Sequence, residues 1–311
     1  MKHTAAIQIA NAPCSWGLIG MGEPAVSWRR MLDEMRAAGY SGTELGDYGF
    51  LPVDPAELAS ELKQRGLSLL GAYFAVNLTE PGEVQRERRR LQQLVELLAA
   101  AESSERRPWL VLADADGRDP VRLLNAGRIE PSMGMNREQW GTLVANTEEL
   151  ARIALDSAGI KTVFHPHCGS YIETPAETEQ LLDSTDRDLI GLVLDTGHYV
   201  YGSGCADEDG LTAARGLQKF RERVSYVHFK DVNPHIAARA RSEGWQFRDS
   251  VREGLFCELG RGSIDFGAVL AGLVEYGYCD WITVEQDVLP GMGTPLESAH
   301  RNRTFLGSLG L

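Results

Sequence analysis

The sequence predicts a single (β/α)8 barrel of the α/β class. Short apolar β-like runs alternate with amphipathic segments from one end of the 311-residue chain to the other, a pattern typical of parallel βα units. Glycine recurs at the end of the helical segments, just before the next strand. No linker rich in proline and serine and no low-complexity tract divides the chain, so we expect one domain over residues 1–311.

Eight β-like runs are rich in apolar residues and are separated by segments of helical pattern. They lie near Ile7–Cys14, Gly42–Leu45, Ser68–Ala75, Trp109–Ala113, Thr162–His167, Gly191–Asp195, Ser225–Lys230 and Trp281–Glu285. Eight parallel strands, each followed by a helix, are the number that closes into this type of barrel.

The segments between these runs carry apolar residues at helical spacing, so each predicts a helix with one face against the sheet. Three such stripes are Leu91, Leu94, Val95 and Leu98; Trp140, Leu143, Val144, Thr147 and Ala151; and Phe266, Val269, Leu270, Leu273 and Val274. Predicted helix ends fall at Gly39, Gly66, Gly159 and Gly277, where glycine adopts the left-handed conformation without steric cost.

Two connections are too long for simple turns. Residues 114–136 follow the fourth predicted strand and residues 232–263 follow the seventh. In a barrel, both connections lie over the C-terminal face, where substrates bind. We therefore expect long loops there that act as lids.

The composition excludes several classes of partner. The chain has 31 basic and 44 acidic residues, and its net charge of −13 would repel a phosphate backbone, so we expect no nucleic-acid partner. No apolar stretch is long enough for a membrane span, and the first residues lack the apolar core of a signal peptide. Five cysteines without CxxC spacing fit a reducing compartment. We expect a cytoplasmic protein; its oligomeric state is open, and a homo-oligomer is possible.

Four polar clusters follow apolar strands at their predicted C-terminal ends. They are His165-Pro-His167, Asp195-Thr-Gly-His198, His228-Phe-Lys-Asp231 and Glu285-Gln-Asp287. In a parallel barrel these four ends meet at one pocket. Residues two apart on a strand face the same side, so the members of each pair His165 and His167, His228 and Lys230, and Glu285 and Asp287 should point together.

Imidazole and carboxylate groups that converge in a pocket provide nitrogen and oxygen ligands for Mn, Co, Mg or Zn. This ligand set does not discriminate among these ions. Taken singly, each cluster also fits a strand-end cap, a hydrogen-bonded histidine or a surface ion pair. These explanations would have to hold at four strand ends together, so the metal site is the favoured interpretation.

Two residues near the first strands are candidate substrate contacts. Trp16 follows the first strand and either stacks on the C–H face of a sugar or packs in the core. Glu44, on the second strand, either binds substrate hydroxyls or pairs with an arginine. The sequence leaves both choices open.

Seven motifs spread over most of the chain resemble the xylose isomerase-like, endonuclease IV-like barrel superfamily of sugar isomerases and epimerases, and within it the inosose dehydratase family. They are Asn11-Ala-Pro-Cys-Ser-Trp-Gly17, Gly42-Thr-Glu-Leu-Gly46, His165-Pro-His-Cys-Gly-Ser-Tyr-Ile-Glu-Thr174, Leu194-Asp-Thr-Gly-His198, Tyr226-Val-His-Phe-Lys-Asp231, Arg252-Glu-Gly-Leu-Phe-Cys-Glu-Leu-Gly260 and Val284-Glu-Gln-Asp287. The pieces His-Pro-His-Cys-Gly and Phe-Cys-Glu-Leu-Gly point to the inosose dehydratase family.

The resemblance implies a divalent metal, most often Mn or Co. Asp195, His228 and Glu285 match the Asp, His and Glu ligands of the superfamily. Many relatives have a glutamate as fourth ligand where this chain has His165-Pro-His167. Either one of these histidines replaces it or Glu173 folds back from the following loop; we expect Glu173, with His167 as the next choice.

The chemistry that the resemblance implies is dehydration of a keto-inositol, 2-keto-myo-inositol (scyllo-inosose), to a cyclohexane dione. Candidate catalytic residues are His165, His167, His198 and Lys230, without individual assignment of base and acid. The alternative is a keto-sugar or keto-inositol isomerase or epimerase that passes through a metal-stabilised enediolate. A DNA-repair nuclease on this fold would need a basic groove, which the net charge of −13 argues against. A non-catalytic polyol-binding protein is a further alternative, and it would keep its ligand affinity after metal removal.

Overall fold

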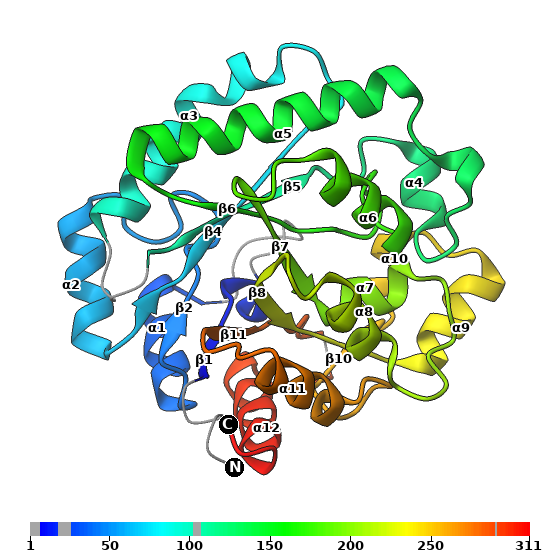
Figure 1. Cartoon of the computed structure of the whole chain (residues 1–311). Coiled ribbons are helices and arrows are strands. Elements are labelled where there is room, and N and C mark those ends of the chain that lie inside the picture. The colour runs from blue at the N-terminus through cyan, green and yellow to red at the C-terminus, as the bar shows by residue number, and fades with distance from the viewer. Residues whose placement is uncertain (1–6, 18–25, 102–106, 290) are drawn as a thin grey trace.

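The computed structural model describes residues 7–17, 26–101, 107–289 and 291–311. A parallel sheet forms the centre of the molecule (Figure 1). Its strands are β1 (Gln8–Asn11), β2 (Gly42–Thr43), β3 (Ser68–Leu69), β4 (Gly71–Val76), β5 (Trp109–Asp114), β6 (Thr162–Phe164), β7 (Ile190–Asp195), β8 (Val224–Phe229) and β11 (Trp281–Val284). The predicted strands are confirmed, with boundaries that differ by up to three residues.

The order of the strands shows that the sheet closes on itself. It runs β3-β2-β1-β11-β8-β7-β6-β5-β4, with parallel pairing throughout. Only Leu70 separates β3 from β4, so the two ends of the sheet belong to one stretch of chain. The Leu45 N–H donates to the Gly71 carbonyl at 2.9 Å. Counting β3 and β4 as one strand gives eight, and the (β/α)8 barrel prediction is confirmed.

Helices surround the barrel (Figure 1). Those that connect successive strands are α1 (Trp28–Ala37), α2 (Pro55–Arg65), α3 (Glu83–Ala100), α5 (Arg137–Ala158), α6 (Pro175–Ser184), α8 (Thr212–Phe220) and α11 (Phe266–Glu275), and α12 (Pro295–Ser308) follows the last strand. Shorter elements lie near the strand ends: η2 (Pro13–Trp16) and α7 (Thr196–Gly202).

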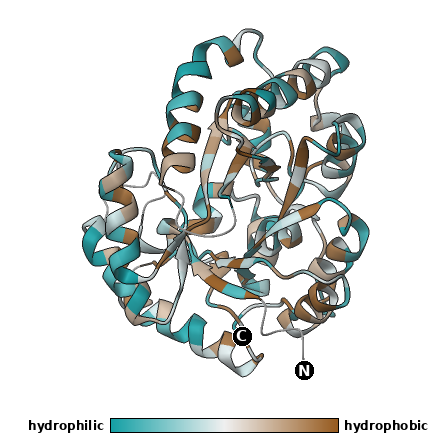
Figure 2. Ribbon diagram, turned by 60° about the vertical axis from the view of Figure 1, so that its left-hand side comes forward, coloured by the Kyte–Doolittle hydropathy of each residue, from teal (hydrophilic) through white to brown (hydrophobic). Residues whose placement is uncertain are grey.

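The four predicted helix-ending glycines all have positive φ, from +64° at Gly66 to +93° at Gly39. The backbone conformation therefore confirms these four predicted helix ends. The apolar stripe of α3 is confirmed as well, since Leu91, Leu94 and Leu98 are buried against the barrel. Figure 2 shows hydrophobic residues along the strands and hydrophilic ones on the surrounding helices.

One cluster of side chains fills the interior of the barrel, with a residue from nearly every strand. Its members are Ala10, Leu70, Val111, Val163, Val193, Tyr226 and Trp281, all buried. A larger apolar cluster lies between the strands and the helices. We call this interior cluster the apolar floor of the barrel. The polar residues at the C-terminal strand ends lie directly above it.

The two long connections are not plain loops. Residues 114–136 contain α4 (Pro120–Asn125) and η3 (Pro131–Met133). Residues 232–263 contain α9 (Pro234–Glu243), α10 (Phe247–Arg252) and β10 (Phe256–Cys257), which pairs antiparallel with β9 (Asp231–Val232). Within the described part of the chain, no helix is both long and apolar enough to cross a bilayer.

Candidate metal centre and active-site cavity

The period of two along each strand places a cluster of polar side chains directly above the apolar floor. Val163, Val193 and Tyr226 point into the barrel. The residues two positions later are His165, Asp195 and His228, so they point the same way.

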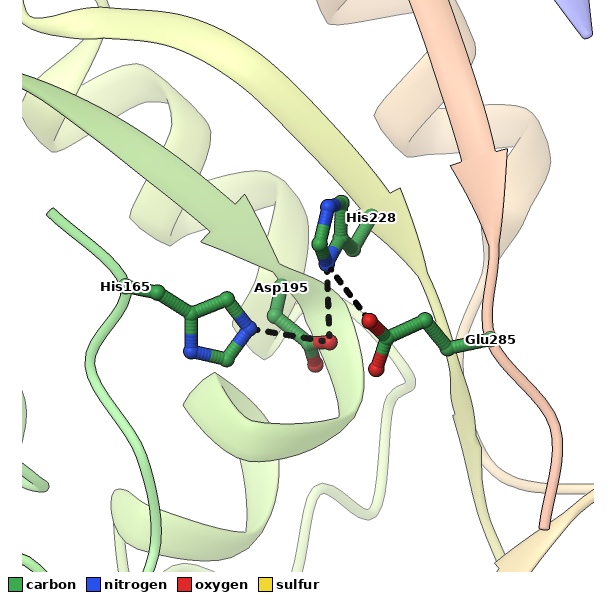
Figure 3. Close-up of side chains that lie close together, drawn as sticks. All are labelled: His165, Asp195, His228 and Glu285. Atoms are coloured by element: carbon green, nitrogen blue, oxygen red, sulfur yellow. Dashed lines mark ion pairs between the residues drawn. The ribbon is translucent and has the colours of Figure 1, made fainter. Parts of the chain in front are cut away.

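Four side chains in this layer come close enough to share one ion (Figure 3). One ligand atom from each of His165, Asp195, His228 and Glu285 lies within 4.8 Å of the others. The Oδ2 atom of Asp195 is 3.7 Å from His165 Nε2 and 3.8 Å from His228 Nδ1. His228 Nδ1 is 3.1 Å from Glu285 Oε1. Ligand atoms bonded at about 2 Å to one centre lie at most about 4 Å apart, so small side-chain rotations would bring all four atoms to a common ion.

The donor set fits a divalent cation. Asp195 Oδ2 and His228 Nδ1 are buried and have no hydrogen-bond partner, and such atoms cost free energy unless something compensates them. Two imidazoles and two carboxylates suit Mn, Co or Zn. The buried cluster therefore indicates a divalent metal site.

The position of Asp195 at the start of α7 leaves one of its carboxylate oxygens available to the cluster. Asp195 ends β7 and caps α7, and its Oδ1 accepts a hydrogen bond of 2.7 Å from the His198 backbone N–H. This helix N-terminus stabilises the negative charge. The bond fixes the rotation of the carboxylate, so Oδ2 faces His165 and His228.

A second carboxylate orients His228 from the other side. Glu44 Oε1 lies 2.9 Å from His228 Nε2 and accepts a 2.9 Å hydrogen bond from Tyr226 Oη. Burial lowers the pKa of His228, but the carboxylates of Glu44 and Glu285 outweigh it and raise this pKa well above its ordinary value. A cation must displace the proton on Nδ1, while the Nε2–H bond to Glu44 persists.

Replacement of Glu44 with glutamine is expected to weaken metal binding by about 10- to 100-fold, the usual effect of removing a carboxylate behind a histidine ligand. Titration of the metal-free variant with Mn²⁺ by calorimetry measures the change. Tyr226→Phe removes only the hydroxyl that supports Glu44, so a smaller loss is expected. An unchanged affinity in Glu44→Gln would show that Glu44 does not orient His228.

Lys230 lies on the other side of Glu285. Its Nζ is 3.2 Å from Glu285 Oε2 and 3.5 Å from Asp287 Oδ2, and it sits over the Phe256 ring at 4.5 Å. Burial lowers the pKa of Lys230, but the carboxylates of Asp287 and Glu285 outweigh it and raise this pKa. Lys230 is therefore an ammonium group that holds the free oxygen of Glu285.

A cavity of about 440 Å³ opens beside the cluster, a volume within the range of small-molecule sites. The sequence-predicted residues that line it are Glu44, His165, His167, His198, Lys230 and Glu285. His167 and His198 lie with their ring centroids 4.0 Å apart. The cavity thus combines the ion cluster with two further imidazoles and an ammonium group.

The structure does not bring Glu173, the expected fourth metal ligand, into the cluster. Glu173 is buried outside the cluster, and its two carboxylate oxygens accept hydrogen bonds of 2.6 and 2.7 Å from the backbone N–H groups of Gly127 and Gly169. Burial raises the pKa of Glu173 to about 7. The fourth residue of the cluster is His165, one of the two histidines that the sequence analysis named as alternatives to Glu173 and also grouped with the catalytic residues.

Of the two choices left open for Trp16, the structure shows packing in the core. The one-turn helix η2 turns Trp16 into the core, where it is fully buried and its Nε1–H donates to Glu34 at 2.8 Å. Trp16 is not among the residues that line the cavity.

Several cavity residues were missed by the sequence analysis. Tyr73 comes from β4, Asp116 follows β5, and Phe247, Arg248 and Phe256 come from the segment after β8. The expectation that residues 114–136 and 232–263 lie over the C-terminal face pointed toward all of these residues except Tyr73. Phe256 also lies in the motif Arg252–Gly260, but nothing in the sequence marked it as a cavity residue.

Comparisons with known proteins agree with this geometry. An inosose dehydratase of Clostridium botulinum (strain Alaska E43 / Type E3) is 28% identical over 308 residues, with 98% of each chain covered. An inosose dehydratase of Lacticaseibacillus casei is 30% identical over 302 residues, with 96% of each chain covered.

A solved structure described as the IOLI protein with a bound zinc atom superposes with a TM-score of 0.68 and 16% identity over 97% of this chain and 98% of its own; this likeness shows the fold. Residues 32–303 match the family described as Xylose isomerase-like TIM barrel. The matched range takes in most of the chain and all four residues of the cluster. The chain belongs to the xylose isomerase-like TIM barrel family.

Proposed function

We propose that this chain is a metal-dependent hydro-lyase that dehydrates a keto-inositol, 2-keto-myo-inositol (scyllo-inosose), to a cyclohexane dione. The observation that carries the proposal is the buried cluster of His165, Asp195, His228 and Glu285 beside a cavity that also holds two further histidines. Relatives named inosose dehydratase that align over 96 to 98% of the chain support the choice of substrate.

His165, Asp195, His228 and Glu285 would hold the cation, with Mn or Co as the proposed ion. A divalent cation supplies Lewis acidity, which polarises a ketone oxygen and makes the neighbouring C–H bond more acidic. Glu44 keeps His228 in position through Nε2, and Lys230 does the same for Glu285 through Oε2.

The remaining cavity groups are suited to proton transfer and to substrate binding. His167 and His198 are neutral, since burial lowers the pKa of each. Phe247 and Phe256 pack against these rings and exclude water from one side of the cavity. Asp287 and Asp116 line the same cavity and offer oxygen acceptors to the hydroxyls of a polyol.

The test is an activity assay with defined metals. The protein is stripped with a chelator, reloaded separately with Mn²⁺, Co²⁺, Mg²⁺ or Zn²⁺, and incubated with scyllo-inosose and with ketohexoses. We expect the stripped protein to be inactive, and Mn²⁺ or Co²⁺ to restore a dione chromophore from scyllo-inosose.

Two other outcomes would contradict the proposal. An epimeric or isomeric sugar without loss of water would assign the chain to the isomerases and epimerases. Turnover that survives complete removal of metal would contradict the metal dependence itself.

A further inference from the structure

His167 and His198 contact the same residue through their Nδ1 atoms, but in opposite senses. His167 Nδ1 lies 2.9 Å from the carbonyl oxygen of Cys168. The backbone N–H of Cys168 donates to His198 Nδ1 at 3.2 Å. A carbonyl only accepts and an N–H only donates, so these two contacts determine where the proton of each ring lies.

The polarity of the two bonds gives the two rings different tautomers. His167 must carry its proton on Nδ1 to donate to the carbonyl, which leaves a lone pair on Nε2. His198 must have a lone pair on Nδ1 to accept the N–H, which places its proton on Nε2. Turning either ring over would place a carbon atom against the Cys168 backbone group and lose the bond.

The surroundings keep both rings in this arrangement. Cys168 is fully buried, and its Sγ also contacts the His198 carbonyl at 3.4 Å. The Phe247 ring centroid lies 5.6 Å from that of His167, and the Phe256 ring centroid lies 5.1 Å from that of His198. Both histidines line the cavity, and their Nε2 atoms are on the ring edges that face away from Cys168.

We infer that the backbone of Cys168 gives the two histidines different roles. His167 presents an Nε2 lone pair that takes the substrate proton. His198 presents an Nε2–H that donates a hydrogen bond to a substrate oxygen. This assignment of roles rests on the proposed dehydration. The assignment of tautomers rests only on the contacts with Cys168.

The proton and electron balance of the dehydration follows from these roles. The C–H bond beside the ketone breaks, its proton goes to His167 Nε2, and its electron pair forms an enolate. As the ketone C=O bond re-forms, this pair becomes a new carbon–carbon double bond, and the neighbouring C–O bond breaks. The departing oxygen takes the bond pair and the proton held by His167, and it leaves as water. The product is the enol of the dione, and it becomes the dione when the enol O–H proton is lost and a proton is gained at the far carbon of the new double bond. His198 keeps its Nε2 proton throughout.

The first part of the experiment reads the tautomers directly. Long-range ¹H–¹⁵N spectra of the full chain loaded with diamagnetic Zn²⁺ distinguish a ring nitrogen that carries hydrogen from one that does not. The signals are assigned by their loss in His167→Gln and His198→Gln. We expect hydrogen on Nδ1 of His167 and on Nε2 of His198. The same tautomer in both rings, or the reverse pair, would overturn the inference.

The second part uses matched substitutions in the metal-loaded enzyme. Glutamine retains an N–H donor near the position of Nε2, so His198→Gln should lose less than about 10-fold in kcat, whereas His198→Ala should lose about 100- to 1,000-fold. An amide oxygen is not basic, so His167→Gln and His167→Ala should both lose about 100- to 10,000-fold. The exposed residue His300 provides the control His300→Gln, for which wild-type activity is expected.

The two parts separate failure of the roles from failure of the proposed function. Glutamine that preserves activity at His167 but not at His198 would overturn the roles. A wild-type chain that leaves scyllo-inosose unchanged would count against the proposed dehydration, while the spectra would still support or overturn the tautomers.

Discussion

Replacement of Glu285 with glutamine is expected to lower kcat by at least about 1,000-fold while the fold remains intact. The change removes the one ligand that faces both the ion cluster and Lys230, since Oε1 lies 3.1 Å from His228 and Oε2 lies 3.2 Å from Lys230. A neutral amide oxygen is a weak ligand. A loss of about 4 kcal/mol of transition-state stabilisation corresponds to about 1,000-fold in rate and lies within the contribution of a Lewis-acidic cation.

The measurements are kcat with scyllo-inosose, Mn²⁺ affinity by calorimetry, and the circular dichroism melting curve. The matched control is Glu275→Gln, an exposed glutamate near the end of α11, for which all three should equal the wild type. Lys230 keeps Asp287 as a partner at 3.5 Å, so no large loss of stability is expected in Glu285→Gln. Normal turnover in this variant would show that Glu285 is not part of the site.

Replacement of Arg122 with methionine is expected to lower the free energy of unfolding by about 3–5 kcal/mol, the usual cost of leaving a buried charge without its partner. The Arg122 side chain is fully buried. It binds both oxygens of Glu177, at 2.7 and 2.9 Å, and donates from Nε to the Ser170 carbonyl at 2.9 Å. These bonds attach α4 to the segment that follows β6.

Urea unfolding of the metal-free protein measures this loss. The control is Arg187→Met, because Arg187 and Glu222 form a 3.6 Å pair whose side chains are 65% and 68% exposed; a change of less than about 1 kcal/mol is expected. Adding Glu177→Gln to Arg122→Met should recover part of the loss, because it removes the unpaired charge. A loss below about 1 kcal/mol in Arg122→Met would contradict the importance of this pair.

The sequence was sufficient for the barrel because its signals are local. Apolar runs of strand length repeat along the chain, glycines with positive φ follow α1, α2, α5 and α11, and packing on a common core then closes the sheet. One of the two largest boundary differences is at β6, which ends at Phe164 although a strand to His167 was predicted. Pro166 has no N–H to donate to a neighbouring strand, so pairing stops before it.

Helices within the two long connections were also readable from the sequence. Asp119 precedes Pro120 and caps α4 through bonds to two backbone N–H groups. Asn233 precedes Pro234 and caps α9 in the same way. A capping residue followed by proline is a helix-start signal, but the length of these segments led to their description as loops.

All four clustered residues were placed at one pocket because each follows an apolar strand at its predicted C-terminal end. Asp195 and His228 lie two residues after the inward-facing Val193 and Tyr226, and Glu285 directly follows β11. The roles of Glu173 and Trp16 depended on side chains outside strands. Backbone N–H groups from two separate segments, at Gly127 and Gly169, bind the Glu173 carboxylate, and a single helical turn directs Trp16 into the core.

The central claim is that His165, Asp195, His228 and Glu285 bind one divalent cation. The most direct measurement is a crystal structure of the Mn²⁺-loaded protein with anomalous scattering data for manganese. We predict one strong anomalous peak with all four side chains at bond distances of roughly 2 Å. A peak bound by Glu173 instead of His165, or no peak between these four side chains, would contradict the account.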